Sequence, residues 1–514
     1  MLRSVMTVGG WTMASRILGF ARDMLIASRL GAGPVADAFF VALKLPYLFR
    51  RLFGEGAFNA AFVPAFAGTL ATEGRAAAQA LAERMAALMA IWLGTLVALG
   101  LVFMPWIMRA LAPGFIDEPA KFQLAIELTR ITFPYLFFIC LTALVAGVLN
   151  GLDRFAAAAA APIFFNVISM MTLLWLTPYV ATPGHALAWG VTLSGIAQLA
   201  LVLWAAAQAG MALNILRPPA ISPEVKLVLR RMIPGVIGAG VVQLNLAVDI
   251  IIASLLPSGA VSFLYYADRV AQLPLGVIGA AVGTALLPLL ARQLRSGQKL
   301  SAHRSMNRAI EMSLLLTLPA AAGLAAAATP IIAALFERGA FGPVETVASS
   351  RALVAYAIGL PAFVLIKVFA PAFFARGDTA TPVKLGLFAV ALNLAFNLVL
   401  MGPLQHAGVA LATSLSAWVN AALLALVLMR RRQLLLDRRL RRSVPRLVLA
   451  SAAMAAIVVG VGMLMPPAAS ALARAGIAAV VIGAGAATFS LIAVAIGAIK
   501  PRETLRMFRR RRGA

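Results

Sequence analysis

The stretch SRILGFARDMLIASRLGAGPVADAFFVALKLPYLFRRLFGEGAFNAAFVP (residues 15–64) sets charged side chains into sequence that is otherwise apolar enough to span a membrane. An arginine at the middle of a bilayer costs roughly 2.5–3.5 kcal/mol on insertion scales, so it normally faces the protein interior or a water-filled cavity. The excess of arginine predicts a cavity that holds an anion. The residues that carry this prediction are Arg16, Arg22, Asp23, Asp37, Lys44, Arg50, Arg51 and Glu55.

The composition of the chain is that of a membrane protein. Of its 514 residues, 62% are hydrophobic and only 12% are charged, and a soluble domain could not cover so much apolar surface. Repeated apolar runs of about 20 residues predict membrane-spanning helices instead. The expected fold is an all-α polytopic membrane protein with about 14 transmembrane helices.

Basic residues gather in alternate connections between the predicted spans. The run RRRQLLLDRRLRR (430–442) follows an even-numbered span, whereas odd-numbered connections such as GAGP near residue 33 are short and poor in basic residues. The positive-inside rule therefore places both termini in the cytoplasm. The net charge of +26 reflects this topology and not a groove for nucleic acid. The expected spans are 4–30, 35–67, 84–112, 122–149, 157–180, 185–209, 227–256, 262–292, 308–336, 347–375, 382–402, 405–430, 446–465 and 473–498.

The sequence repeats itself with an offset near 225 residues. Pro134 and Pro361 are 227 residues apart, and Asp153 and Asp378 are 225 apart. The repeat predicts two lobes of six spans with the same orientation, as in transporters that rock about a central site. The expected domains are an N-terminal lobe (1–215), a C-terminal lobe (216–430) and a basic linker with two further spans and a basic tail (431–514).

The charged groups of the first two spans allow two interpretations. On a helix with 100° per residue, Arg16 and Asp23 lie about 20° apart and Arg22 lies about 120° from Arg16, so the helix must border a cavity or other helices on most sides. The groups could grip phosphate oxygens through guanidinium forks, or Arg–Asp pairs could simply hold helices together. Arg269 on a later span favours the cavity, although Asp268 beside it could neutralise it. Pro46 and the glycines at 54 and 56 should bend or break the second span.

No motif for catalysis or for a metal site is found in the sequence. The single cysteine, Cys140, excludes an internal disulfide, and His185, His303 and His406 form no metal-binding pattern. The sequence also lacks a nucleophile–base pair, and no loop between the spans is long enough for a catalytic domain. The chain is therefore predicted not to be an enzyme.

Motifs along the whole chain resemble the MurJ (MviN) family of the multidrug/oligosaccharidyl-lipid/polysaccharide exporter superfamily. The resemblance implies a flippase for lipid II, the undecaprenyl-diphosphate-linked peptidoglycan precursor, that works by alternating access and carries lipid II to the outer leaflet of the bacterial cytoplasmic membrane. The motifs are SRILGFARD, ADAFFVALKLPYLFRRLFGEGAFNAAFVP, APGF, ITFPYLFF, YYADRVAQLPLGVIGAAVGTALLP, APAFFARGDTATPVK and GPLQHAGVALA.

The resemblance also implies residues for the substrate site. The cavity arginines of the family fall on Arg16, Arg22, Arg50 and Arg269, the cavity carboxylate falls on Asp37, and Asp23 keeps its place after Arg22. Arg51, Glu55 and Asn166 carry over from neighbouring motifs. A diphosphate bears about two negative charges, which suits several convergent arginines in a cavity of restricted dielectric.

Some members of the family use a sodium site, which is the only cofactor that the resemblance suggests. Its positions fall on Asp249, Asn393, Asn397, Val409 (through its carbonyl) and Thr413. Asn397 stands where those members place a second carboxylate, and the loss of one anionic ligand should weaken Na⁺ binding. The alternatives are that Asp249 is a paired polar residue, or that it is linked to protons or to the membrane potential.

The rival interpretations are two other transporters, one enzyme class and a structural scaffold of the division machinery, which would need no buried arginines. A drug/cation antiporter should have an acidic cavity, which the arginines disfavour, whereas an exporter of another polyprenyl-linked sugar differs only in family motifs. A membrane-bound glycosyltransferase should carry an acidic metal motif in a large loop. The expected partners are lipid II, membrane lipids and the cell-wall synthesis machinery.

Overall fold

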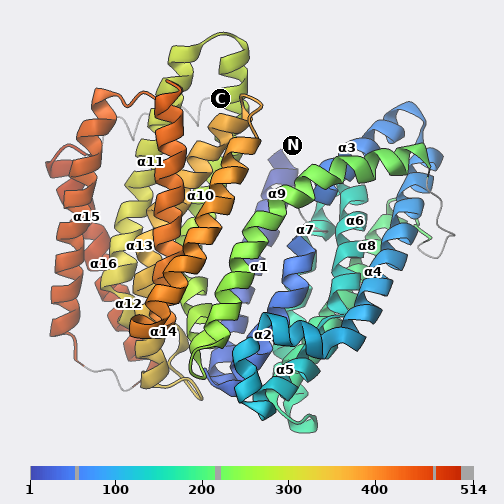
Figure 1. Ribbon diagram of the computed structural model, residues 1–514, viewed down its shortest axis with the longest axis horizontal. Helices are drawn as coiled ribbons and strands as arrows, with labels where there is room; N and C mark the ends of the chain where they lie inside the picture. Colours follow the sequence, from blue (N-terminus) through green and yellow to red (C-terminus); the bar gives the residue numbers. More distant parts are fainter. Residues whose placement is uncertain (1, 52–56, 215–221, 467–469, 499–514) are drawn as a thin grey trace. The chain divides into compact units, whose positions relative to one another are not determined.

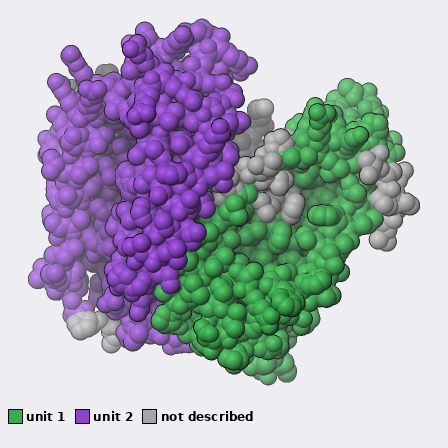
Figure 2. Space-filling view, viewed as in Figure 1, with its two compact units in different colours: residues 1–262 green, residues 263–514 purple. Residues whose placement is uncertain are grey.

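The computed structural model describes residues 2–51, 57–214, 222–466 and 470–498. Within these ranges the chain consists of helices joined by turns and short loops, and its one extended pairing is an isolated β-bridge between Arg338 and Phe341. The chain divides into two compact units, Met1–Ser262 (unit 1) and Phe263–Ala514 (unit 2), which are coloured separately in Figure 2. The predicted all-α class is confirmed. The boundary between the two lobes of the repeat, which was expected at residues 215 and 216, stays a prediction.

Unit 1 contains nine α-helices and two short 3₁₀ helices within the described residues, and its helices appear in blue to green in Figure 1. Proline occupies the first turn of several of them, where its missing N–H is not needed. The elements are α1 (Leu2–Leu30), α2 (Pro34–Arg50), α3 (Ala57–Thr72), α4 (Arg75–Leu111), η2 (Pro113–Asp117), α5 (Pro119–Thr132), α6 (Tyr135–Gly151), α7 (Phe155–Trp175), η3 (Thr177–Tyr179), α8 (Pro183–Gln208) and α9 (Pro223–Ser254).

Unit 2 holds the remaining helices, except that the first turn of α10 belongs to unit 1. Ser470 and Asp437 cap two of these helices, since their side chains accept hydrogen bonds from the backbone amides of Ala473 and Leu440. The elements are α10 (Ala260–Arg295), α11 (Lys299–Ala326), α12 (Ala328–Phe336), α13 (Pro343–Phe374), α14 (Ala380–Arg430), α15 (Arg438–Leu464) and α16 (Ala471–Ala495).

Nine helical stretches among the described residues are long and apolar enough to cross a membrane. One of them, Pro119–Gly151, comprises α5 and α6, which the chain separates at Phe133 and Pro134. The chain is thus a multi-pass membrane protein, while the count of fourteen spans stays a prediction. The break predicted at the glycines at 54 and 56 lies outside the described residues.

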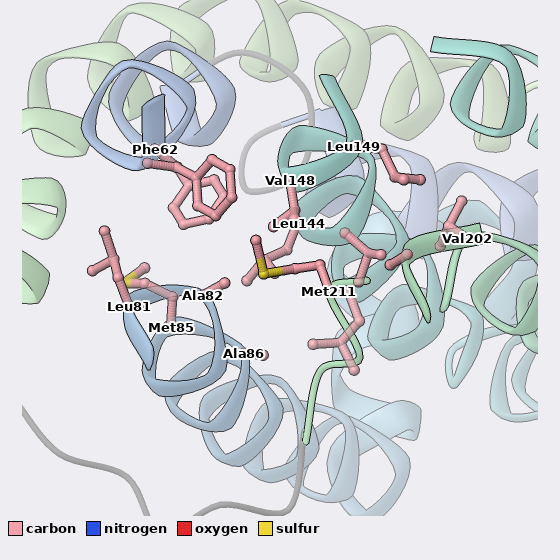
Figure 3. Packing of buried hydrophobic residues seen from close by; sticks show 14 of the residues in the cluster. Phe62, Leu81, Ala82, Met85, Ala86, Leu144, Val148, Leu149, Val202 and Met211 are labelled. Carbon is pink, nitrogen blue, oxygen red and sulfur yellow. The ribbon is translucent and has the colours of Figure 1, made fainter. Parts of the chain in front are cut away.

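The core of unit 1 is an apolar cluster between α3, α4, α6 and α8. The side chains point toward one another from these four helices and from the turn after α8 in Figure 3. They are small aliphatic groups interleaved with larger ones, a pattern that allows close helix contact. The labelled members are Phe62, Leu81, Ala82, Met85, Ala86, Leu144, Val148, Leu149, Val202 and Met211.

The last two helices, α15 and α16, pack on unit 2 through both apolar and polar contacts. Leu440 and Leu447 of α15 join the buried cluster of α11, α13 and α14. At the start of α16, Arg474 Nη1 lies 3.1 Å from Glu337 Oε1, and its Nη2 donates to the Glu337 carbonyl at 2.7 Å. Helix α15 is therefore fixed to the rest of unit 2 by apolar contacts, and α16 by an ion pair and a hydrogen bond.

Helix α14 is two antiparallel segments joined at Gln405, whose φ of 50° and ψ of −131° are not helical. A straight helix of this length would hold its ends roughly 75 Å apart. Instead Asp378, which precedes α14, lies 2.6 Å from Arg431 Nη1, which follows it. The two spans predicted at 382–402 and 405–430 are therefore the two arms of one helical hairpin. An ion pair joins the ends of the arms that lie away from the turn.

The closure of this hairpin should depend on pH in the acid range. The amide and hydroxyl of Thr381 and then Arg431 hold the pKa of Asp378 at about 2, below the ordinary 3.8. Because the folded-state pKa is the lower one, the stabilisation is complete above about pH 4 and is lost as the pH falls through about 2. We expect Asp378→Asn to melt at a lower temperature than wild type at pH 7, and the difference to shrink toward pH 2 in detergent. A difference that stays constant with pH would contradict the role of the carboxylate charge.

Candidate functional site

Arg22 and Asp23 of α1 form a buried ion pair. The Arg22 side chain is 6% exposed and that of Asp23 is 3% exposed. Arg22 donates from Nη2 and Nε to Asp23 Oδ1, at 2.7 and 3.1 Å, and its guanidinium carbon lies 5.1 Å from the ring centre of Phe165 on α7. The guanidinium is thus held in place from two sides.

Asn166 fixes α1 against α7 next to this pair. Its Nδ2 donates to the carbonyl of Ser15 at 2.9 Å, and the side chain is almost fully buried. A Cβ at Gly19 would lie in ordinary van der Waals contact, 3.6 Å, from Asn166 Oδ1. The amide therefore sets the register of the helix that carries both Arg16 and Arg22.

Arg16 is exposed and lines an open groove on unit 1. The groove has a volume of about 370 Å³ and lies between α1, the end of α6 and the start of α7. Arg16 and Arg22 are six residues apart, which is about 9 Å along a helix. The residues that line the groove are Val8, Thr12, Ser15, Arg16, Asn150, Phe155, Ala158, Ala159 and Pro162.

Arg50 is the last residue of α2 and Arg51 follows it, and the two side chains have different surroundings. The Arg50 guanidinium carbon lies 5.5 Å from the ring centre of Tyr47, one helical turn earlier, while Arg51 is exposed. Glu55, the other predicted site residue of this region, lies outside the described residues. The structure thus brings Arg22 and Arg50 onto neighbouring aromatic rings, those of Phe165 and Tyr47. Asp23 contacts Arg22, Asn166 contacts Ser15, and Arg16 lines the groove.

Asp37 lies in a separate, fully buried network. Its carboxylate is 3.1 Å from the ammonium of Lys121 and accepts hydrogen bonds from the backbone amides of Gly259 and Ser262, at 2.7 and 2.9 Å, and from the Ser262 hydroxyl at 2.6 Å. These amides belong to the start of α10, where a carboxylate is favourable. Asp37 thus caps the start of α10. Its role in substrate binding stays a prediction.

Lys121 and the aromatic rings are site features that were not predicted from the sequence. Lys121 is 3% exposed and also contacts Ser258 Oγ at 2.7 Å and the ring of Phe115 at 4.2 Å. It lies in PGFIDEPAK, which looks like a connection poor in basic residues. Its only signal was that it is a lone cation three residues after Glu118. Tyr47 had a clearer signal, since it precedes Arg50 by three residues on one helix.

Arg269 belongs to unit 2 and is half-buried. Its Nη2 donates to the hydroxyl of Tyr265 at 3.0 Å, and its guanidinium carbon lies 5.0 Å from the centre of that ring. Asp268 instead accepts a hydrogen bond from Gln272 at 3.1 Å. The described contacts therefore place Arg269 on an aromatic ring, as they do Arg22 and Arg50.

The predicted sodium ligands are divided between the two units. Asp249 is half-buried on α9 of unit 1, whereas the other four lie on α14 of unit 2. Asn393 and Asn397 are completely buried, and the Thr413 hydroxyl donates to the Val409 carbonyl at 3.0 Å. Within the described ranges, no three His, Cys, Asp or Glu side chains are gathered for a metal ion. The sodium site stays a prediction.

Gly195 of α8 lets the ring of Tyr135 approach closely. A Cβ at this position would lie 2.8 Å from Tyr135 Cδ2 and 3.1 Å from Phe138 Cβ. We expect Gly195→Ala to destabilise the protein by about 1–3 kcal/mol, as overpacked cores do, and to lower the melting temperature in detergent. Gly9→Ala is the control, since nothing lies within 4 Å of its added Cβ. Equal melting of the two variants would show that this contact is not tight.

Comparison with known proteins gives one consistent family. A family model described as "Lipid II flippase MurJ" matches residues 26–472. A "Probable lipid II flippase MurJ" of Rhizobium meliloti (strain 1021) is 44% identical, over 100% of this chain and 97% of the relative. The "Lipid II flippase MurJ" of Burkholderia cenocepacia is 38% identical, over 84% of each chain.

Solved structures share the fold. A structure titled "Lipid II flippase MurJ, inward closed conformation" has a TM-score of 0.75 at 24% identity, over 95% of this chain and 97% of that one. An inward-facing multidrug resistance transporter of the MATE family has a TM-score of 0.68 at 16% identity, over 83% and 98% of the two chains. The chain thus has the same fold as these two transporters.

Proposed function

Because the chain belongs to the MurJ family, we propose that it is a flippase that carries lipid II from the inner to the outer leaflet of the bacterial cytoplasmic membrane. The two six-span lobes work by alternating access, so that the site opens to one side at a time. Both termini lie in the cytoplasm, as the basic connections favour. The protein moves its substrate without changing it chemically.

The observation that carries this proposal is the excess of guanidinium groups over carboxylates in unit 1. Arg16, Arg22 and Arg50 carry three positive charges, and Asp23 neutralises one of them, which leaves a net charge of about two. The diphosphate of lipid II bears about two negative charges, and guanidinium forks bind phosphate oxygens in pairs. Burial of Arg22 strengthens its attraction to phosphate oxygens, because the dielectric constant around it is lower than that of water.

The groove beside Arg16 supplies room for the part of the substrate next to the diphosphate. Its volume of about 370 Å³ and its mixture of Thr12, Ser15 and Asn150 with apolar side chains suit a polar headgroup joined to a lipid. Arg269, which belongs to unit 2, is proposed as a further cation for the same substrate. In this proposal, the headgroup is held by arginines while the polyprenyl chain stays in the lipid phase.

Complementation tests the proposal. The resident lipid II flippase of a Gram-negative host is depleted, this chain is expressed, and growth and externally accessible lipid II are followed. We expect rescue by the wild type and by Arg29→Ala, an exposed arginine of α1, and loss of rescue in Arg16→Ala and Arg269→Ala. A chain that is present in the membrane in normal amounts and does not rescue would favour a different polyprenyl-linked sugar as the substrate.

A further inference from the structure

Three aromatic rings from three helices form one cluster in unit 1. The ring centres of Tyr47 on α2, Tyr135 on α6 and Phe165 on α7 are 5.6–6.3 Å apart in every pairing. The Tyr47 and Tyr135 rings are perpendicular, at 88°, and the other two pairs are tilted. Such spacings and angles are those of favourable aromatic pairs. The three rings thus behave as one packed body.

Two arginines of the proposed site lie on this cluster. The guanidinium carbon of Arg22 is 5.1 Å from the Phe165 ring centre, and that of Arg50 is 5.5 Å from the Tyr47 ring centre. Both distances are within the range of about 6 Å in which a cation is attracted to the face of a ring. Arg22 and Arg50 come from different helices, so the cluster fixes each of them relative to the other.

The cluster is anchored in the buried interior of unit 1. Tyr135 is completely buried, and its ring packs against Gly195, where an added Cβ would overlap it. Its hydroxyl lies 3.5 Å from Gln198 Oε1, and Gln198 Nε2 donates to the Ala161 carbonyl of α7 at 2.9 Å. Tyr135 is therefore held by contacts within α6, α7 and α8 that do not involve the arginines.

An aromatic ring holds a cation without cancelling its charge. A carboxylate also orients a guanidinium, as Asp23 orients Arg22, but it removes one unit of the positive charge that an anionic headgroup needs. A ring attracts the cation through its quadrupole and carries no formal charge. The same device recurs in unit 2, where Arg269 lies on Tyr265. Of the four arginines proposed to bind the substrate, three thus have a ring contact among the described residues.

We infer that Tyr47, Tyr135 and Phe165 are positioning residues, which orient Arg22 and Arg50 toward a diphosphate without neutralising them. This inference rests on the proposed function, since it assigns a task to the same site. The rings do not touch the substrate in this scheme. They act through the two guanidinium groups and set the angle at which these groups meet the phosphate oxygens.

The test is a pair of double-mutant cycles on the purified full-length protein, with lipid II in nanodiscs as the probe. We expect Tyr47→Leu and Phe165→Leu to weaken lipid II binding about three- to tenfold, the range that the loss of one cation–ring contact gives. Tyr47→Phe keeps the ring and should bind as the wild type does. In an Arg50→Ala background, Tyr47→Leu should have no further effect, and Phe165→Leu should have none in an Arg22→Ala background.

Each outcome separates the inference from the proposed function. If Arg22→Ala and Arg50→Ala bind lipid II as the wild type does, the proposed arginine site is wrong. If they bind weakly while Tyr47→Leu and Phe165→Leu bind normally, the site stands and the positioning role is wrong. The role is also wrong if the leucine variants weaken binding equally with and without the arginines, because a merely structural effect would persist. Melting temperatures identify a variant that does not fold. If one ring variant does not fold, the double-mutant cycle on the other ring decides whether the positioning role is correct.

Discussion

Arg22→Ala is expected to abolish rescue of a host depleted of its lipid II flippase. The buried guanidinium is held by Asp23 and Phe165, so no solvated side chain can take its place. Loss of one partner from a buried, hydrogen-bonded charge contact costs about 2 kcal/mol or more, which corresponds to at least about thirtyfold weaker binding. Lipid II binding to the purified variant and growth of the depleted host measure the effect.

The ion pair with Asp23 calls for a matched control. Arg22→Ala alone leaves a buried carboxylate without this guanidinium, which destabilises the fold. Arg22→Ala/Asp23→Asn removes both charges and should recover much of the melting temperature, while it still binds lipid II at least about thirtyfold more weakly than the wild type. Arg22→Lys keeps the charge but not the fork, and should bind with intermediate affinity. Normal growth of the double variant as the only flippase would refute the role of Arg22.

Lys121→Met is expected to cause a large loss of stability. The ammonium and the Asp37 carboxylate are both almost completely buried, and removal of one partner from such a pair costs about 3–5 kcal/mol. Asp37 would keep its three hydrogen bonds to Gly259 and Ser262, so the cost should fall at the lower end of that range. Thermal unfolding in detergent and the amount of protein in the membrane measure the change.

Two further variants test whether the charge pair causes this loss. Lys226→Met replaces an exposed lysine at the start of α9 and should leave the melting temperature unchanged. Asp37→Asn/Lys121→Met removes both charges and should melt above Lys121→Met alone. If Lys121→Met melts together with Lys226→Met, the buried pair contributes nothing to stability.

The helices could be predicted from the sequence because apolar runs and prolines are local signals. The spans expected at 157–180 and 185–209 correspond to α7 (Phe155–Trp175) and α8 (Pro183–Gln208) within a few residues. The interruption between α5 and α6 was missed, since Pro134 lies within an uninterrupted apolar run. The hairpin in α14 was expected as two spans, because GPLQ at 402–405 has turn composition.

The candidate site was predictable only in part, because a contact between distant helices has no local signal. Arg22 and Asp23 stood out as charges in an apolar helix, and the structure shows both of them buried. The hydrogen bond from Asn166 to Ser15 joins residues 151 positions apart, and the partner of Asp37 lies 84 positions away at Lys121. Aromatic rings in an apolar span look like ordinary core residues, so the cluster under Arg22 and Arg50 became visible only in three dimensions.

The network around Asp37 also implies an order of events during synthesis. Lys121 leaves the ribosome 141 residues before Ser262, and at about 5–20 residues per second this interval lasts roughly 7–30 s. During that time the α10 amides that donate hydrogen bonds to the Asp37 carboxylate have not yet been made. Among the described contacts, Lys121 is the one charged partner of Asp37 that is already present. We therefore expect the ion pair between Asp37 and Lys121 to form first, so that the start of α10 later docks onto a carboxylate that already has a cationic partner.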